Sequence, residues 1–158
     1  MTRDEWIEVC GTALKVECIK HFHPLEIADV GREVPATSPQ KSLRLQAPPT
    51  YLISNVILLC RVLLDLRLAR RPMPILVNSW YRDGVYNHRI GGVSRSMHLV
   101  CGAADVIKYG FTPDEVADIL ETHPESDQFG IGRYKTFTHI DIRGMIGRPS
   151  PARWGSNE

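Results

Sequence analysis

Two histidines and one aspartate have residue types and positions that could form a metal site. His98 and Asp105 lie seven residues apart with small residues between them, and His139 lies in a later segment. A turn at Gly102 could bring the first two side chains together. Nitrogen and oxygen ligands are typical of zinc, and three protein ligands leave a fourth tetrahedral position for water, as in catalytic sites.

The segment 138–143 alternates strictly between polar and apolar residues, which is typical of a half-buried strand. The apolar positions Ile140 and Ile142 are expected to face the core. The polar positions then share the other face, since side chains alternate along a strand: His139, Asp141 and Arg143. A solvated sheet surface would tolerate the same row, so the alternation alone leaves a site and a solvent-exposed face open.

The cysteines show no metal or redox spacing. None of the four is part of a C-x-x-C motif: Cys10, Cys18, Cys60 and Cys101. No secretory signal is visible, so synthesis in the cytoplasm and a reducing compartment are expected. Free cysteines there usually serve as small core hydrophobes, which leaves any metal to histidine and carboxylate.

Composition predicts a globular domain that does not bind nucleic acid and has no membrane span. The 158 residues are 43% hydrophobic and 23% charged, with a formal net charge of +1 and no basic stripe. The longest apolar stretch, 56–60, is far shorter than the ~20 residues that a membrane span needs.

The expected elements alternate helices and short strands. Helices are predicted over Asp4–Phe22 and Thr50–Arg70, with a long irregular segment, 25–49, between them. A third helix starts at the capping box Thr112–Glu115 and ends at Glu121 or His123. Strands are predicted over Ile75–Val77, Ala103–Ile107 and 138–143, a polar loop over Asp83–Gly92, and a tail over 145–158.

This order predicts an α+β fold in one domain spanning residues 1–158. We expect a central, mostly antiparallel sheet flanked by helices. The polar row on the last strand and the His98–Asp105 segment would then place a zinc site on the face of that sheet.

The motif Ser-x-His-x(6)-Asp, followed by a His-x-Asp strand, resembles the zinc D-Ala-D-Ala carboxypeptidases and L-Ala-D-Glu endopeptidases of peptidoglycan. The same fold core occurs in D-Ala-D-Ala dipeptidases and in the hedgehog signalling domain. The resemblance is closest to a small single-domain branch, and it rests on Pro74-Ile75, Ser79, Tyr81-Arg82, Asn87, Gly91-Gly92, Ser96, His98, Ala103, Asp105, Phe137, His139, Asp141, Arg143-Gly144 and Arg153-Trp154.

The resemblance implies one Zn²⁺ held by His98, Asp105 and His139. It also implies hydrolysis of peptidoglycan stem peptides by a zinc-activated water. Arg82, at the family's Tyr-Arg position, is then a catalytic and substrate-binding candidate for the substrate carboxylate or the oxyanion. A salt bridge from Arg82 to Asp83 or Asp105 is the alternative.

Three further residues are candidates for binding substrate: Ser96, Asn87 and Arg143. Ser96 could bond to the substrate or cap the local turn. Arg143 could also pair with Asp141 and keep that carboxylate ionised, which would weaken it as a base.

The general base departs from the pattern of the dipeptidases and phage endolysins. Their acidic residue three positions before the last histidine ligand is Thr136 here, and threonine cannot accept a proton at neutral pH. Asp141 is the nearest candidate, with Glu125 and Asp127 in reserve. Asp141 could instead orient a ligand histidine.

Two alternatives to a zinc peptidase remain open on the sequence. The first is a non-catalytic zinc-binding module of the same fold, such as a phage structural or binding component. The second is a thiol enzyme that uses Cys101 beside His98. The expected setting is a bacterium or a phage-infected cell, with action on the wall after release or as part of the virion, and with a monomer favoured.

Overall fold

A five-stranded sheet forms the centre of the computed structural model, which describes residues 2–28 and 47–155. Its strands are β1 (Ile75–Ser79), β2 (Ala103–Lys108), β3 (Gly130–Arg133), β4 (Thr138–Asp141) and β5 (Ala152–Trp154). The spatial order is β1-β2-β4-β3-β5, and only the β3–β5 pair is parallel. The predicted α+β fold with a mostly antiparallel sheet is therefore confirmed.

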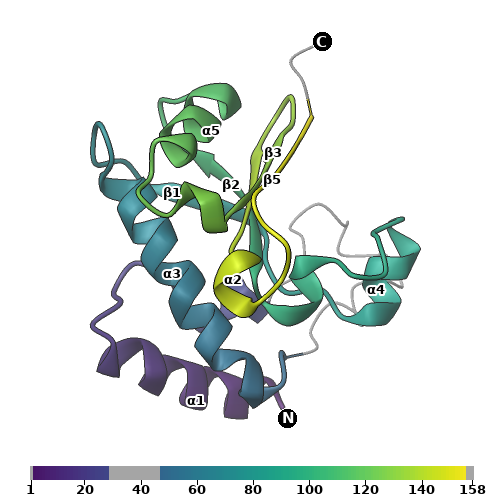
Figure 1. Cartoon of the computed structure of the whole chain (residues 1–158). Coiled ribbons are helices and arrows are strands. Elements are labelled where there is room, and N and C mark those ends of the chain that lie inside the picture. The colour runs from purple at the N-terminus through teal and green to yellow at the C-terminus, as the bar shows by residue number, and fades with distance from the viewer. Residues whose placement is uncertain (1, 29–46, 156–158) are drawn as a thin grey trace.

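The described helices surround this sheet. They are α1 (Arg3–Val16), α2 (Pro24–Ala28), α3 (Ile53–Leu68), α4 (Gly84–Arg89) and α5 (Pro113–Glu121). Short 3-10 turns are η2 (Thr50–Leu52), η3 (Met97–Val100), η4 (Ser126–Gln128) and η5 (Gly144–Ile146). In Figure 1, α3 and α5 lie to one side of the sheet and α4 to the other, so two different environments flank the strands.

The hydrophobic core lies between the sheet and the long helices. α1 contributes the i, i+4, i+8 face of Trp6, Cys10 and Leu14, and the indole nitrogen of Trp6 donates to the Pro24 carbonyl at 2.9 Å. The interior residues of β2, β3 and β4 on the same side are also buried: Ala104, Val106, Ile131 and Ile140. The candidate metal-binding residues are therefore on the opposite face of the sheet, away from this core.

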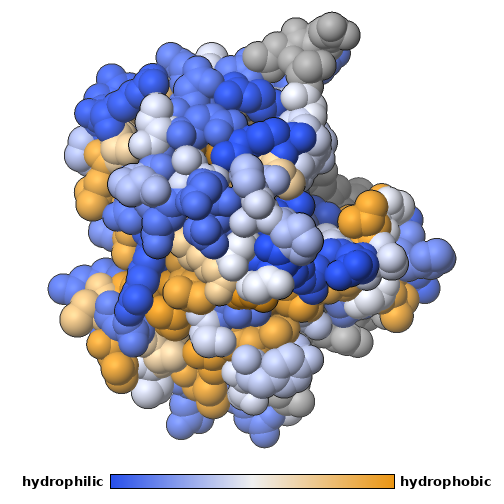
Figure 2. Space-filling model, viewed as in Figure 1, coloured by the Kyte–Doolittle hydropathy of each residue, from blue (hydrophilic) through white to orange (hydrophobic). Residues whose placement is uncertain are grey.

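The surface also differs from one region to another. Figure 2 shows hydrophobic side chains over α3 and toward α1, whereas strongly hydrophilic side chains gather over α5 and between the sheet and α4. Among the described helices, none is both long and apolar enough to cross a membrane.

Several predicted boundaries were wrong at the ends of elements. α1 ends at Val16 rather than near Phe22, because Cys18 adopts a left-handed conformation (φ 57°) and Ile19 bonds back to the Leu14 carbonyl. Cys18 is exposed, whereas Cys10, Cys60 and Cys101 are buried free thiols as expected.

The segments predicted to be irregular contain regular structure. The segment 25–49 begins within helix α2, and its residues 29–46 lie outside the described part of the chain. The polar loop contains α4, which starts because the Asp83 carboxylate accepts hydrogen bonds from the amides of Val85 and Tyr86. The tail contains η5 and β5, and the connection to β4 contains β3.

Lys108 links the sheet to the end of α3. Its side chain is fully buried, and Nζ donates to the carbonyls of Leu66 and Ala69 at 2.7 and 2.5 Å. The Leu66 carbonyl lies in the last turn of the helix, the Ala69 carbonyl also accepts from the Arg71 amide at 2.7 Å, and a cation at this end complements the helix dipole.

We expect Lys108→Met to lower the free energy of unfolding by about 1–3 kcal/mol, because the buried Leu66 carbonyl loses its donor and the Ala69 carbonyl loses one of two. Urea denaturation followed by circular dichroism measures the change. The control is Lys135→Met in the exposed β3–β4 turn, for which a change within about 0.5 kcal/mol is expected. Equal midpoints for the two variants would contradict this role of Lys108.

Candidate active site

Strand register brings the three candidate ligands together. Asp105 on β2 lies directly opposite His139 on β4, and directly opposed residues share a sheet face. His98 comes from η3, whose first turn is capped by the Ser96 hydroxyl. The chain then reverses through Cys101 (φ 55°), not through Gly102 as the sequence suggested, and enters β2.

The three ligand atoms have spacings that suit a tetrahedral ion. His98 Nε2 lies 3.3 Å from His139 Nδ1 and 3.4 Å from Asp105 Oδ1. Ligand atoms at the usual zinc distances of about 2.0–2.1 Å are about 3.3–3.4 Å apart in a tetrahedron. The third spacing, between His139 Nδ1 and Asp105 Oδ1, is a hydrogen-bond length of 2.8 Å. All three residues are buried, and their ligand atoms lie within 4.8 Å of one another.

Each histidine is held by its second ring nitrogen. His98 Nδ1 donates to the carbonyl of Trp80 at 2.6 Å, which leaves the Nε2 lone pair facing the other ligands. His139 Nε2 lies 3.2 Å from Asp141 Oδ2, which leaves Nδ1 facing Asp105. This is the usual arrangement around metal-binding histidines, in which an outer partner fixes the tautomer and the ring orientation.

The electrostatics of His98 and Asp105 favour metal binding, whereas a metal at His139 would have to displace a proton. Burial lowers the pKa of His98, so its ring is neutral at physiological pH. Burial opposes ionisation of Asp105, but hydrogen bonds from His139 and His98 outweigh it and hold the pKa of that carboxyl well below its usual range. Burial alone would lower the pKa of His139, yet its bonds to Asp105 and Asp141 raise it. A neutral imidazole and an ionised carboxylate are the forms that coordinate a metal.

Arg82 contacts the outer oxygen of Asp105. Its Nη2 lies 2.5 Å from Asp105 Oδ2, and its Nε donates to the Ser79 hydroxyl at 2.9 Å. The salt bridge that was the alternative role of Arg82 therefore forms, to Asp105 and not to Asp83. It holds the carboxylate so that Oδ1 faces the histidines.

Asp141 is fully buried, and both of its oxygens are engaged. Arg143 donates from Nε and from its backbone amide to Oδ1 and from Nη2 to Oδ2, and His139 Nε2 contacts Oδ2. Burial would raise the pKa of this carboxyl, but the bonds from Arg143 and His139 outweigh it and lower the pKa well below its usual range. A carboxylate held in this way orients His139 and is a weak base.

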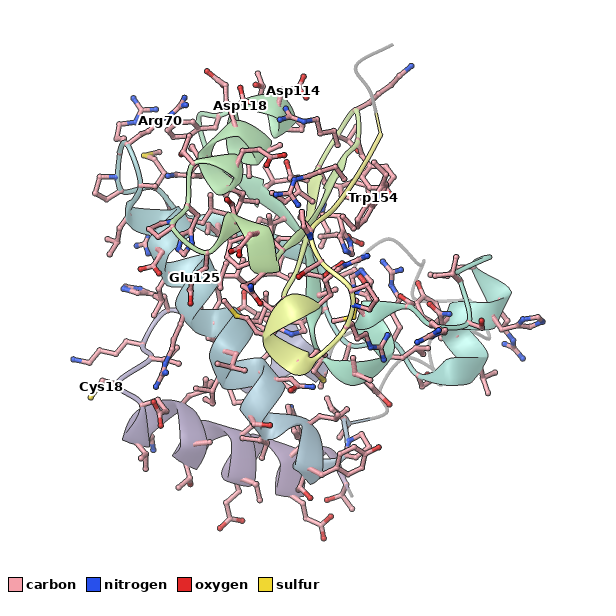
Figure 3. The ribbon with its side chains drawn as sticks, viewed as in Figure 1. Cys18, Arg70, Asp114, Asp118, Glu125 and Trp154 are labelled. Carbon is pink, nitrogen blue, oxygen red and sulfur yellow. The ribbon has the colours of Figure 1, made fainter. Side chains whose placement is uncertain are left out.

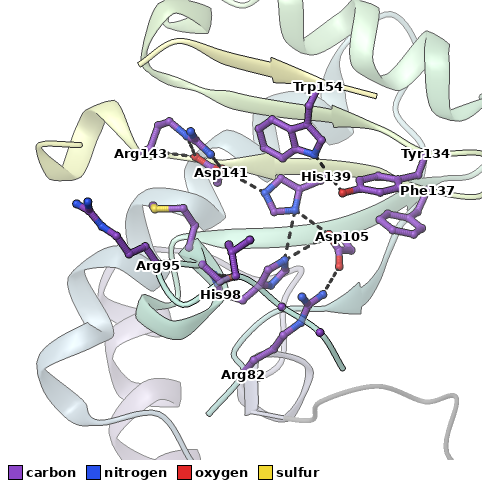
Figure 4. Close-up of a pocket in the computed structure, with 15 residues that line it drawn as sticks. Arg82, Arg95, His98, Asp105, Tyr134, Phe137, His139, Asp141, Arg143 and Trp154 are labelled. Atoms are coloured by element: carbon purple, nitrogen blue, oxygen red, sulfur yellow. Dashed lines mark hydrogen bonds and ion pairs between the residues drawn. The ribbon is translucent and has the colours of Figure 1, made fainter. Parts of the chain in front are cut away.

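The ligand cluster opens into a cavity of about 550 Å³. Figure 4 shows Arg95 and Arg143 at one end, Tyr134 and Phe137 at the other, and the ligand cluster between them. The aromatic rings are held together, because Tyr134 stacks on Phe137 with centroids 4.5 Å apart and Trp154 Nε1 donates to the Tyr134 hydroxyl. The Trp154 ring also lies 5.1 Å from the His139 ring.

A family model described as Peptidase M15 matches residues 21–141, which is most of the chain and includes all three candidate ligands. The chain belongs to the Peptidase M15 family. Its members are zinc-dependent peptidases, so the family implies a hydrolase of the metallopeptidase class, and the group His98–Asp105–His139 could hold the ion. A comparison with curated proteins gives no match.

The other predicted substrate residues of this M15 chain occupy different positions. Ser96 lines the cavity and also caps η3. Asn87 is buried and does not line the cavity; its side-chain amide donates to the Val93 carbonyl at 3.0 Å and so supports the cavity loop at Gly91-Gly92. Arg143 lines the cavity while it holds Asp141.

The reserve bases of the M15 chain lie away from the cavity. Glu125 and Asp127 are exposed, and neither lines the cavity. Figure 3 places Glu125 toward the α3 side of the molecule and Trp154, a cavity residue, toward the opposite side. Thr136 is exposed in the turn before β4. Cys101 packs in the hydrophobic core and does not line the cavity, and burial raises the pKa of its thiol well above the usual value, so it is poorly suited to act as a nucleophile on a substrate of this M15 chain.

Eight cavity residues were not among the predicted site residues: Gly91, Gly92, Val93, Arg95, Met97, Tyr134, Phe137 and Trp154. The signal that could have revealed the aromatic wall is Gly130-Ile131-Gly132. These glycines face the site on β3, opposite Asp141 and His139, while Ile131 enters the core. A side chain at Gly132 would collide with the Trp154 ring, and one at Gly130 would lie 2.4 Å from Asp141 Oδ2.

Gly130→Ala is therefore expected to weaken the M15 site. A Cβ there meets the Asp141 carboxylate and Arg143 Nε at 2.6 Å, so the Asp141–His139 contact has to shift. We expect zinc affinity to fall on the order of tenfold, as when an outer partner of a ligand is disturbed. Competition with a chromogenic chelator measures it. Gly84→Ala, where a Cβ meets nothing within 4 Å, should leave the affinity unchanged. Unchanged affinity in Gly130→Ala would refute the argument.

Proposed function

We propose that the protein hydrolyses peptide bonds in the stem peptides of bacterial peptidoglycan, as a D-Ala-D-Ala carboxypeptidase or as an L-Ala-D-Glu or D,D-endopeptidase. The observation that carries the proposal is the convergence of His98 Nε2, Asp105 Oδ1 and His139 Nδ1 at zinc-ligand spacing beside an open cavity. Membership in the M15 family supports the same reaction.

The residues around the ligands have separable tasks in this reaction. Bound zinc supplies a Lewis acid that lowers the pKa of water toward ~7 and polarises a carbonyl. Asp141 and the Trp80 carbonyl fix the two imidazoles, and Arg82 fixes Asp105. Within the described residues, Arg82 Nη1 has no hydrogen-bond partner, so it can donate to a substrate oxygen that gains charge in the transition state.

The aromatic end of the cavity positions the rest of the substrate. Tyr134, Phe137 and Trp154 form a continuous wall beside His139. Such a wall binds the aliphatic parts of a peptide and excludes water from one side of the reacting carbonyl.

A non-catalytic zinc module is the second candidate, and one observation favours it. Among the described residues that line the cavity, the only acidic ones are Asp105 and Asp141, and both are already engaged in ion pairs. No other carboxylate of the described chain is placed there to accept a proton. Such a module would bind zinc tightly without turnover.

Digestion of purified peptidoglycan separates the two candidates. The zinc-loaded protein is incubated with the purified peptidoglycan. New amino groups are counted, and the released muropeptides are identified by mass spectrometry. The peptidase predicts new amino termini at one type of bond and none after removal of zinc. Zinc bound at about one ion per chain without any new amino group would favour the module instead.

A further inference from the structure

A second, smaller cavity continues from the arginine end of the first. It has a volume of about 210 Å³ and is lined by Arg95, Met97, Arg143, Arg148 and Pro149. Arg95, Met97 and Arg143 also line the large cavity, so the two spaces are contiguous. Whatever occupies the small cavity can thus belong to the same molecule as a group held at the ligand cluster.

One arginine of the small cavity, Arg148, is held in place by the backbone. Gly147 adopts a left-handed conformation (φ 75°) and ends η5, and the next amide, that of Arg148, donates to the Arg143 carbonyl at 2.8 Å. Arg148 Nη1 then donates to the Arg95 carbonyl at 2.8 Å. The loop after β4 and the loop before η3 are joined by this bond, and both contribute a cation to the cavity.

Two of the three arginines of this cluster, Arg95 and Arg148, have no carboxylate partner among the described residues. Of the residues that the structure describes, no acidic one lines the small cavity, and Asp141, which contacts Arg143, already has both oxygens occupied. In the described chain neither Arg95 nor Arg148 forms an ion pair. Like charges brought together repel one another unless an anion lies between them, so the arrangement favours a bound anionic group.

The arginine cluster makes the two ends of the large cavity chemically different. The ligand cluster lies between the arginines and the aromatic wall (Figure 4). A peptide that crosses the ligands would therefore place an apolar part against Tyr134 and Trp154 and a negatively charged part beside Arg95.

We infer that Arg95 and Arg148 form a subsite for an oxyanion of the substrate, namely a free carboxylate on the peptide next to the bond that is cut. The inference rests on the proposed function and adds a specificity determinant to it. Guanidinium groups bind both carboxylate and phosphate through paired hydrogen bonds. The experiment therefore has to distinguish a carboxylate of the peptide from free phosphate.

Binding to the metal-free full-length protein tests the subsite without turnover. The probes are a synthetic stem pentapeptide with a free glutamate α-carboxylate and the same peptide with that group as an amide. Calorimetry is expected to show the acid binding on the order of tenfold more tightly than the amide. The difference should disappear in Arg95→Gln and in the double variant Arg95→Gln/Arg148→Gln. It should persist in Arg89→Gln, an exposed arginine of α4 outside both cavities.

Equal affinity for acid and amide in the unsubstituted protein would overturn the inference. So would inorganic phosphate bound through Arg95 and Arg148 in the absence of any acid–amide difference. Arg95→Gln removes an exposed side chain, so a folding defect is not expected to obscure the result. Acid–amide discrimination without hydrolysis by the zinc-loaded protein would retain the subsite and remove only the proposed function. Hydrolysis by the zinc-loaded protein with equal affinity for acid and amide would retain the proposed function and remove the subsite.

Discussion

Zinc binding and peptide hydrolysis are both expected to be lost when His98 is replaced by alanine. His98 supplies one of three ligand atoms, and its Nε2 is aimed by the Trp80 carbonyl. With two protein ligands left, the ion is held weakly, and the Lewis-acid contribution of several kcal/mol is removed. We expect kcat/KM to fall on the order of 10³-fold or more. Atomic emission after gel filtration measures the zinc, and release of amino groups from peptidoglycan measures the activity.

The control for this experiment is His88→Ala. His88 is exposed on α4 and does not line the cavity, so zinc content and activity should be unchanged. Because His98 is buried, His98→Gln is added to keep the volume of the side chain and to separate loss of ligand from loss of packing. A folded His98 variant with full zinc content would show that the ion binds elsewhere.

Asp141→Asn is expected to weaken zinc binding roughly 10- to 100-fold, the usual cost of removing the outer partner of a histidine ligand. An amide cannot accept from His139 Nε2 and also satisfy the two donors of the Arg143 side chain as the carboxylate does. His139 then loses the partner that fixes its tautomer. Chelator competition measures the affinity, and kcat at saturating zinc is measured separately.

The two measurements distinguish the two roles of Asp141. A positioning residue predicts that most of the loss lies in zinc affinity, and that Arg143→Gln, which leaves the carboxylate in place, causes a smaller loss. A general base predicts unchanged zinc affinity and a kcat lowered by 10²-fold or more. Asp127→Asn, an exposed aspartate outside the cavity, is the matched control and should change neither quantity.

Much of the site could be predicted because its residues leave strong local patterns. The alternation over 138–143 put His139 and Asp141 on one face and Ile140 in the core, as the structure confirms. The helix after Thr112 has the predicted capping box and the proline in its first turn. Both patterns depend on neighbouring residues alone, so one sequence suffices to find them.

The elements that sequence reasoning missed depend on distant partners. β3 contains two glycines in four residues, which is unfavourable for a strand, and it forms because glycine leaves space for Asp141 and Trp154. β5 is three residues long and exists through its pairing with β3. α4 has few apolar residues and begins at the side chain of Asp83.

The role of Asp141 illustrates the same limit at the level of one side chain. Its pairing with Arg143 was predictable from their spacing on the chain. The contact from His139 is also local, whereas the complete burial of the carboxylate depends on Gly130, which lies opposite Asp141 on the separate strand β3. These contacts support the orienting role, which the sequence had left level with the role of base and which the zinc-affinity and kcat measurements on Asp141→Asn test.

Zinc restoration tests the central claim most directly. The protein is stripped of metal with a chelator and titrated with Zn²⁺, while amino groups released from peptidoglycan are counted at each step. A zinc peptidase with one site at His98, Asp105 and His139 predicts activity that rises from zero and reaches a plateau at one equivalent of zinc per chain. Activity that is independent of zinc, or no release of amino groups at full zinc occupancy, would contradict it.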